Sequence, residues 1–243
     1  MIRRGWRLHT VVLLQVCLVA APLAAAGSRW QAATQAASSA AQASPELVGL
    51  LSTEIGATPV SVSDAAHAGD VVIVSIPQKA VPDLPRGLFA NVPESVVVVD
   101  TGNYYPELRD GRIEAIERGL LDSEWVAQQL GRAVIKAFNS LYARSLRDKG
   151  VPPKTPGRVA LPVAGDRPEA KSAVLRLVDE LGFDPVDAGD LAGSWRQQPG
   201  APAYCRDLEA AALRRALAEA DRSRIAAYRA EQKARTRKEI GSR

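Results

Sequence analysis

The sequence is poor in the side chains that usually carry nucleophilic, acid–base or metal chemistry. Its 243 residues include two histidines and two cysteines, and aromatic residues make up 5% of the chain. Cys17 and Cys205 lie far apart without a CxxC spacing, and neither His9 nor His67 stands in an HExxH or triad-like context. We therefore expect no disulfide framework, no metal site and no side chain that acts as a catalytic residue.

Acidic residues are absent from the first 44 positions, so the four arginines there account for the whole formal net charge of +4. Arg3, Arg4 and Arg7 precede the apolar run Val11–Ala21, and the small residues that follow complete a pattern typical of a secretory signal. The run is too short for a transmembrane helix. No recognition motif accompanies the basic residues, so we expect neither nucleic acid nor a membrane as a partner, and homo-oligomerisation stays open.

From Pro45 onward, short apolar runs alternate with helical patterns, which is typical of a parallel sheet with crossover helices. Val71–Ile76 is a nearly continuous β-branched run, as expected of a strand that helices cover on both faces. The other expected strands are Thr58–Ser61, Val96–Val99, Ala133–Phe138, Arg158–Ala164 and an edge strand at Asp184–Asp187. The expected helices are Pro45–Ile55, Ser123–Leu130, Arg167–Leu181 and Leu208–Arg237.

The pattern predicts an α/β fold with a doubly wound, mostly parallel, Rossmann-like sheet and a C-terminal α-helical extension. We divide the chain into a signal-like or mis-translated, Ala-rich segment at 1–44, an NADP-binding-type α/β domain at 45–208, and a charged C-terminal helix and tail at 209–243. The first βα unit of the α/β domain is incomplete in this division.

Six segments, taken in order, carry a resemblance to a known family. They are Val74–Val81, Asp100–Pro106, Lys136–Ser140, Leu161–Asp166, Gly182–Gly189 and Ser194–Gly200. Together they resemble the NADPH-dependent reductases of the deazaflavin coenzyme F-420, which are NAD(P)-binding Rossmann-type oxidoreductases. One departure is Gly102, where the family usually has a second Thr or another small polar residue.

The resemblance implies hydride transfer between NADPH and coenzyme F-420, with NADP as cofactor and the deazaflavin as co-substrate. Such chemistry needs no acid, base or nucleophile from the protein, because the two rings hold the reactive atoms. Ligands of open α/β sheets bind outside the carboxyl ends of the strands. We therefore predict six cofactor-binding residues, all near predicted strand ends: Ser75, Pro77, Thr101, Asn103, Lys136 and Asn139.

By resemblance, Ser75 and Pro77 line the path of the dinucleotide, while Lys136 and Asn139 lie near the nicotinamide. The simpler alternatives are that Pro77 only ends a strand and that the two asparagines, 103 and 139, form turns through their own backbones.

The glycine-rich turn that this family places after its first strand is missing. In a Gly-x-Gly-x-x-Gly turn, backbone amides close on the pyrophosphate at a helix N-terminus. Gly5 and Gly27 are the only glycines among residues 1–45. Val11–Val19 is apolar and long enough to occupy the vacant central strand. We therefore predict that hydride transfer is impaired and that the chain binds NADPH poorly or not at all.

Three explanations of the N-terminal segment stay open. In the first, the segment is a mis-called start or an out-of-frame translation. In the second, it is a genuine signal on an exported, non-catalytic relative. In the third, it is part of a cytoplasmic pseudoenzyme. The expected location is cytoplasmic, with export as the alternative if Met1–Ala26 is a true signal. The functional alternatives are a binding protein without turnover and an NADPH-dependent reductase of another small acceptor, because a fold does not determine a substrate.

Overall fold

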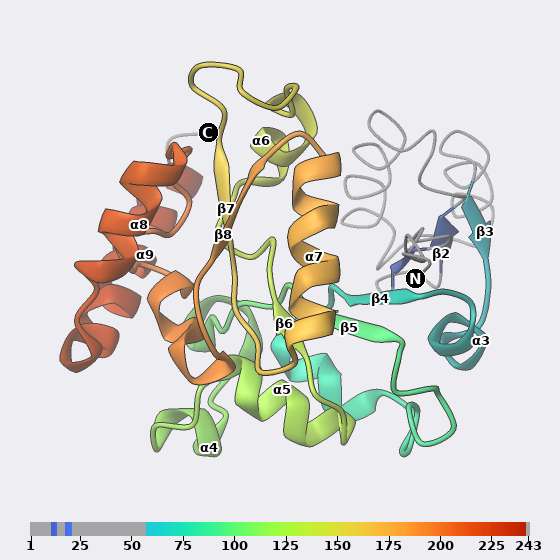
Figure 1. Ribbon diagram of the computed structural model, residues 1–243. Coiled ribbons are helices and arrows are strands. Elements are labelled where there is room, and N and C mark those ends of the chain that lie inside the picture. Colours follow the sequence, from blue (N-terminus) through green and yellow to red (C-terminus); the bar gives the residue numbers. More distant parts are fainter. Residues whose placement is uncertain (1–10, 14–17, 21–56, 242–243) are drawn as a thin grey trace.

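The computed structural model describes residues 11–13, 18–20 and 57–241 of the chain (Figure 1). The predicted helix Pro45–Ile55 and most of the segment Met1–Ser44 lie outside these residues. The strands are β1 (Val11–Leu13), β2 (Leu18–Ala20), β3 (Ala57–Pro59), β4 (Val71–Val74), β5 (Val97–Asp100), β6 (Ile135–Lys136), β7 (Ala160–Val163) and β8 (Asp184–Asp187). The α-helices are α3 (Val62–His67), α4 (Glu114–Glu117), α5 (Asp122–Leu130), α6 (Ala143–Asp148), α7 (Pro168–Glu180), α8 (Ala210–Ala218) and α9 (Ile225–Gly241). Short helical turns are η2 (Gln78–Asp83), η3 (Pro106–Asp110), η4 (Leu191–Gln197) and η5 (Arg222–Arg224).

Six strands form one sheet in the order β3-β2-β1-β4-β5-β6. β1, β4, β5 and β6 are parallel to one another. β2 runs antiparallel to both of its neighbours, and only residues 14–17 separate it from β1. The predicted Rossmann-like α/β fold with a mostly parallel sheet is confirmed. The strand beside β4 comes from Val11–Leu13, within the apolar run that we expected to occupy this place.

Helices cover β4 and β5 on both faces, which explains their β-branched sequences. All side chains of the two strands are buried. Because successive side chains of a strand point to opposite faces, Val71 and Ile73 enter a core shared with α7. Val72 and Val74 enter a second core, shared with α3 and α5. Each fully buried valine or isoleucine contributes roughly 1.5–3 kcal/mol, so the seven aliphatic positions of the two strands hold the centre of the sheet together.

β7 and β8 form a second, two-stranded parallel sheet. α7 packs on one face of this sheet and α8 on the other (Figure 1). An isolated antiparallel bridge between Lys136 and Ala164 joins it to β6. The predicted edge strand Asp184–Asp187 is therefore present with the predicted bounds, but it pairs outside the main sheet.

β6 is shorter than the predicted strand Ala133–Phe138. Phe138 has a φ of 63°, in the left-handed region that residues other than glycine seldom adopt. This conformation turns the chain out of the sheet directly after the strand. The turn brings Asn139 back toward Asn103, to which it is hydrogen-bonded.

The C-terminal extension consists of two helices, so the prediction of one continuous helix over Leu208–Arg237 is wrong. α8 ends at Ala218 and α9 begins at Ile225. Asp221 accounts for the break, because its carboxylate accepts hydrogen bonds from the backbone N–H and the hydroxyl of Ser223. Its own N–H donates to the hydroxyl of Tyr228, which lies on α9. Among the described helices, none is both long enough and apolar enough to cross a bilayer.

Candidate functional site

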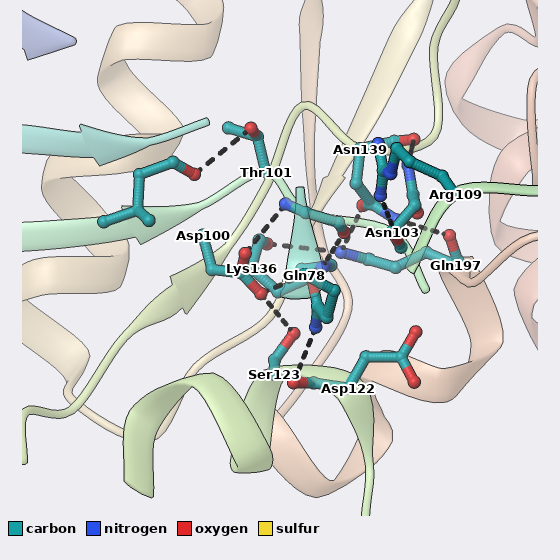
Figure 2. A network of polar contacts seen from close by, with 12 residues as sticks. Gln78, Asp100, Thr101, Asn103, Arg109, Asp122, Ser123, Lys136, Asn139 and Gln197 are labelled. Carbon is teal, nitrogen blue, oxygen red and sulfur yellow. Dashed lines mark hydrogen bonds and ion pairs between the residues drawn. The ribbon is translucent and has the colours of Figure 1, made fainter. Parts of the chain in front are cut away.

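The carboxyl ends of β4, β5 and β6 meet at one edge of the main sheet, because the three strands are parallel neighbours. Ser75 and Thr101 follow β4 and β5 directly. The backbone N–H of Thr101 donates to the Val74 carbonyl at 3.1 Å, and its hydroxyl donates to the same oxygen at 3.3 Å (Figure 2). Ser75, Pro77 and Thr101 are all half-buried. Three of the predicted site residues therefore share this edge.

A buried ion pair stands at the ends of β5 and β6. The Lys136 ammonium lies 3.0 Å from Oδ2 of Asp100, and neither side chain is more than 2% exposed. The lysine also donates to the carbonyl of Gly102. The aspartate accepts from the Ser123 hydroxyl at 2.8 Å and from the Gly102 N–H at 2.7 Å. Both charges thus have several hydrogen-bond partners. The pair fixes the backbone of the segment that follows β5, because both residues bond to Gly102.

Three amide side chains form the next part of the network. Nδ2 of Asn103 donates to the Asn139 backbone carbonyl at 3.0 Å, and Nδ2 of Asn139 donates to Oδ1 of Asn103 at 3.1 Å. Asn139 also donates to the Gln197 carbonyl at 2.7 Å. Nε2 of Gln197 donates at 3.2 Å both to Oδ1 of Asn139 and to the carbonyl of Lys136. Figure 2 shows that these groups converge between the strand ends and η4.

The structure brings three of the predicted residues into this single network: Asn103, Lys136 and Asn139. Thr101 lies beside it and bonds to the Val74 carbonyl. The ammonium of Lys136 is fully buried and makes internal contacts. The Asn103 side chain bonds to Asn139, and the Asn139 side chain bonds to Asn103 and to η4, which disfavours the alternative of simple turn formation. Pro77 directly precedes η2, in keeping with a strand-ending role. Contact of the six residues with a cofactor stays a prediction.

Sequence reasoning missed five residues of the network, namely Gln78, Asp100, Arg109, Ser123 and Gln197. Arg109 belongs to it because its guanidinium donates to the Asn103 backbone carbonyl. Gly102 is the signal that could have found Gln78. A Cβ atom at position 102 would lie 2.5 Å from Oε1 of Gln78 and 2.9 Å from Oδ1 of Asp100. The side chain of Gln78 therefore occupies the space that a side chain at position 102 would need, and glycine is the residue that leaves this space free.

Gln78 also links the network to α5 and, through it, to α9. Its Nε2 donates to the Asp122 carbonyl at 3.2 Å, and the Asp122 carboxylate lies 3.2 Å from the guanidinium of Arg229 on α9. Burial raises the pKa of Asp122 above its ordinary value, while the nearby Arg229 acts in the opposite direction. Arg229 also lies 5.1 Å over the ring of Tyr104. The long C-terminal helix is thus attached to the edge that carries the candidate site.

The donors and acceptors described at this edge bond to one another. In the ranges that the structure describes, no group of three or more His, Cys, Asp or Glu side chains could hold a metal ion. The phosphate end of a dinucleotide fits less well. β1 leads within four residues into the antiparallel β2, so the short connection leaves no room for a crossover helix whose N-terminus could receive a pyrophosphate.

Comparisons with known proteins agree with the fold and with the oxidoreductase class. Residues 19–104 match the family model of the NADP oxidoreductases described as coenzyme F420-dependent, which supports an NAD(P)-dependent oxidoreductase family. A crystal structure of a hypothetical protein from Sinorhizobium meliloti is 31% identical, with a TM-score of 0.55, over 68% of this chain and 79% of that protein.

Two further relatives match smaller parts. The protein YjhV of Escherichia coli K12 is 51% identical over 67 residues, which are 28% of this chain, and the match spans about half (49%) of that protein's length. The crystal structure of a proposed F420-dependent NADP reductase from Arthrobacter sp. FB24 is 20% identical, with a TM-score of 0.42, over 56% of this chain and 62% of that protein.

Proposed function

We propose that the chain is a relative of the NADPH-dependent reductases of coenzyme F-420 whose nucleotide binding is impaired. The chain belongs to the same protein family as the Sinorhizobium meliloti protein. One observation carries the proposal. The match to the NADP oxidoreductase family covers residues 19–104 and so includes the segment, from Asp100 to Asn103, that forms the centre of the strand-end network. The whole protein's activity, cofactor and co-substrate are parts of this proposal.

In this proposal the ligand lies along the carboxyl edge of β4 and β5. The half-buried Ser75, Pro77 and Thr101 line its path, and Asn103 and Asn139 stand at its far end. Lys136 acts as a positioning residue, because its ammonium is already bonded to Asp100 and to the carbonyl of Gly102. When bound, NADPH and the deazaflavin supply the hydride chemistry themselves, and the residues of this chain only orient the rings.

The impairment concerns the phosphates. Each pyrophosphate oxygen that loses water without gaining an amide donor costs roughly 1–3 kcal/mol. Two or three such losses weaken binding by about a hundredfold or more. Lys79 is exposed and could supply charge, but a flexible ammonium does not replace a rigid cradle of backbone amides.

Titration of the purified chain with NADPH, followed by fluorescence, tests the proposal. We expect no saturation at micromolar NADPH. A chimera that carries a family-like glycine-rich strand–turn–helix before Pro45 should bind NADPH, and an assay with oxidised F-420 then measures hydride transfer. Micromolar binding with turnover by the unaltered chain would show that the N-terminal segment builds a cofactor site after all.

The same two measurements separate the alternatives. A chimera that binds NADPH but transfers no hydride to any acceptor indicates a non-catalytic binding protein. A chimera that oxidises NADPH with a substrate other than F-420 indicates a reductase of another small acceptor. A chimera that binds no NADPH would refute the assignment of the strand-end edge. The cytoplasmic location is also part of the proposal, and fractionation of the native host, with export as the opposing outcome, tests it.

A further inference from the structure

The two C-terminal helices pack on the α/β domain in different ways. α8 inserts three apolar side chains, Leu213, Ala216 and Leu217, into the core that it shares with β7 and β8. Of the described side chains of α9, only those of Tyr228 and Gln232 are buried. Burial of an apolar face is what fixes most surface helices, so it holds α9 far less firmly than α8.

Charged groups hold α9 instead. The guanidinium of Arg229 lies 3.2 Å from the carboxylate of Asp122 at the start of α5, and its Cζ atom lies 5.1 Å from the centre of the Tyr104 ring. One turn further along α9, Lys233 forms an ion pair with Glu107 on η3. These contacts attach α9 to two elements that adjoin the strand-end network.

Three features weaken this attachment. A cavity of about 240 Å³ interrupts the contact between η3 and α9, so the facing side chains lose dispersion contacts. Docking also takes two charges out of water, because the side chains of Arg229 and Asp122 are 21% and 1% exposed, and this cost offsets much of their attraction. Finally, Oδ2 of Asp122 and Oε1 of Gln232 are buried without a hydrogen-bond partner among the described residues, which is unfavourable.

We propose that α9 is a strap held by charge, which detaches from η3 and α5 and reattaches as a unit while α8 and the α/β domain stay folded. Residues 219–224 are the hinge, since α8 ends at Ala218 and α9 begins at Ile225. The inference does not rest on the proposed function.

The strap controls the order of the segment that leaves the strand-end network. Tyr104 follows Asn103 directly, and η3 begins two residues later. Detachment of α9 takes Arg229 away from the Tyr104 ring and Lys233 away from Glu107. Because both contacts fall on this short segment, η3 becomes less ordered whenever α9 is detached.

The test is amide hydrogen exchange of the full chain in NaCl at about 0.05 M and about 0.5 M, measured by mass spectrometry on peptides from α8, α9 and η3. Rates are normalised to an unstructured reference peptide at each salt concentration. We expect the protection of α9 and η3 to fall about tenfold at the higher salt, which corresponds to about 1.4 kcal/mol, because salt screens the ion pairs. The protection of α8 should change by less than about twofold, since apolar contacts are not screened.

A pair of glycine variants detaches the strap without salt. A Cβ atom at position 200 would overlap the backbone carbonyl of Tyr228 on α9, so Gly200→Ala should lower the protection of α9 and η3 by about tenfold or more. Gly189→Ala is the matched control. The two glycines have φ values of 84° and 90°, but a Cβ atom at position 189 meets no atom within 4 Å, so the control should keep the protection of both elements.

A second pair of variants tests the charge. Arg229→Gln removes the cation that faces Asp122 and should lower the protection of α9 about tenfold. Arg224→Gln removes an exposed cation that pairs with Glu231, within the C-terminal extension itself, and should change the protection by less than about twofold. If the variants of Gly200 or Arg229 do not fold, the salt comparison on the unaltered chain still decides the question.

Four outcomes would overturn the proposal. In the first, α8 and α9 exchange at the same rate and respond equally to salt, which means that they open together. In the second, the protection of α9 is unchanged or rises at the higher salt, which means that apolar contacts hold it. In the third, Gly200→Ala and Gly189→Ala have equal effects on α9. In the fourth, η3 stays protected when α9 does not, so the strap does not order that segment.

Discussion

On one side of β4 the main sheet continues into β1 and β2, three-residue strands that are joined by four residues and pair antiparallel. On the other side it continues into β5 and β6, whose carboxyl ends are joined by the buried pair of Asp100 and Lys136. The first side offers a hairpin where a Rossmann-type domain has a strand, a glycine-rich turn and a helix. The second side has a buried network of side-chain hydrogen bonds, in which Oε1 of Gln78 and Oε1 of Gln197 have no partner among the described residues.

The difference shows that the two parts of a dinucleotide site depend on different segments of the chain. Phosphates are held by backbone amides after the first strand, whereas the far end of the ligand meets side chains after later strands. One part can be lost while the other keeps its geometry. The comparison therefore predicts that the strand-end network of β5 and β6 is a stable unit in its own right, and the following predictions address that claim from the largest expected effect to the smallest.

Lys136→Met should cause the largest loss of stability. The change leaves the Asp100 carboxylate buried without its cation, and removal of one partner of such a pair costs about 3–5 kcal/mol. The free energy of unfolding in urea measures it. Lys171→Met is the matched control, because Lys171 lies 2.9 Å from a 53%-exposed Asp187, where a loss of at most about 1 kcal/mol is expected. Equal losses in the two variants would mean that the buried Asp100–Lys136 pair holds the network no more firmly than an exposed pair.

Gly102→Ala should destabilise the protein by roughly 1–3 kcal/mol, the usual cost of overpacking. The added methyl meets Oε1 of Gln78 and Oδ1 of Asp100. In a double-mutant cycle, Gln78→Ala should cost less in the Gly102→Ala background than in the unaltered chain, because it makes room for the methyl. Additive losses of stability would mean that contact with Gln78 is not the reason why position 102 is a glycine.

Ser123→Ala should cost about 1–2 kcal/mol, because it removes one donor to the buried Asp100 carboxylate. Ser145→Ala provides the comparison. Its hydroxyl donates at 3.0 Å to Asp207, whose side chain is 24% exposed, so water can replace the lost donor and the loss should be smaller. Urea unfolding of both variants measures the difference, and a larger loss for Ser145→Ala would contradict it.

The dependence of stability on pH should carry a contribution from Asp122, at the point where the network reaches α9. Burial raises its folded-state pKa above the ordinary value of 3.8, so the folded protein binds more protons between the two values. This contribution to stability is present below 3.8 and is lost as the pH rises through the folded-state pKa, with a slope of at most about 1.4 kcal/mol per pH unit.

Asp122→Asn removes this titration, so the stability of the unaltered chain relative to the variant should increase as the pH falls through that window. Unfolding curves at a series of pH values measure the difference. A difference between the two proteins that is independent of pH, or one that grows in the opposite direction, would show that Arg229 outweighs burial at this carboxylate.

The predictable parts of the fold are those with a local signal. Val71–Ile76 and Val96–Val99 are β-branched runs, and their strands were found to within about two residues. The break at Asp221 was missed, because the helix pattern of Leu208–Arg237 continues through it and the bond from Asp221 to Tyr228 appears only once α9 is folded. The end of β6 was also missed, since nothing in the sequence around Phe138 indicates a left-handed backbone conformation.

The site divides in the same way. Thr101 and Asn103 could be placed at a strand end because they follow a recognisable strand, and the parallel pairing then brings them beside Ser75. Gln197 could not be placed, because 58 residues separate it from Asn139, and a glutamine in a helical turn carries no signal of its partner. The same is true of Ser123 and Asp100, which are 23 residues apart.

The sequence by itself determined the α/β class, the order of the strands that follow Val71 and the absence of a glycine-rich turn near the N-terminus, because hydrophobic period and glycine content are local properties. Only the tertiary structure decided that Lys136 is a buried partner of Asp100, and that Asn139 bonds to Gln197. Whether a polar side chain faces water, an ion pair or a cavity depends on which distant segments pack against it.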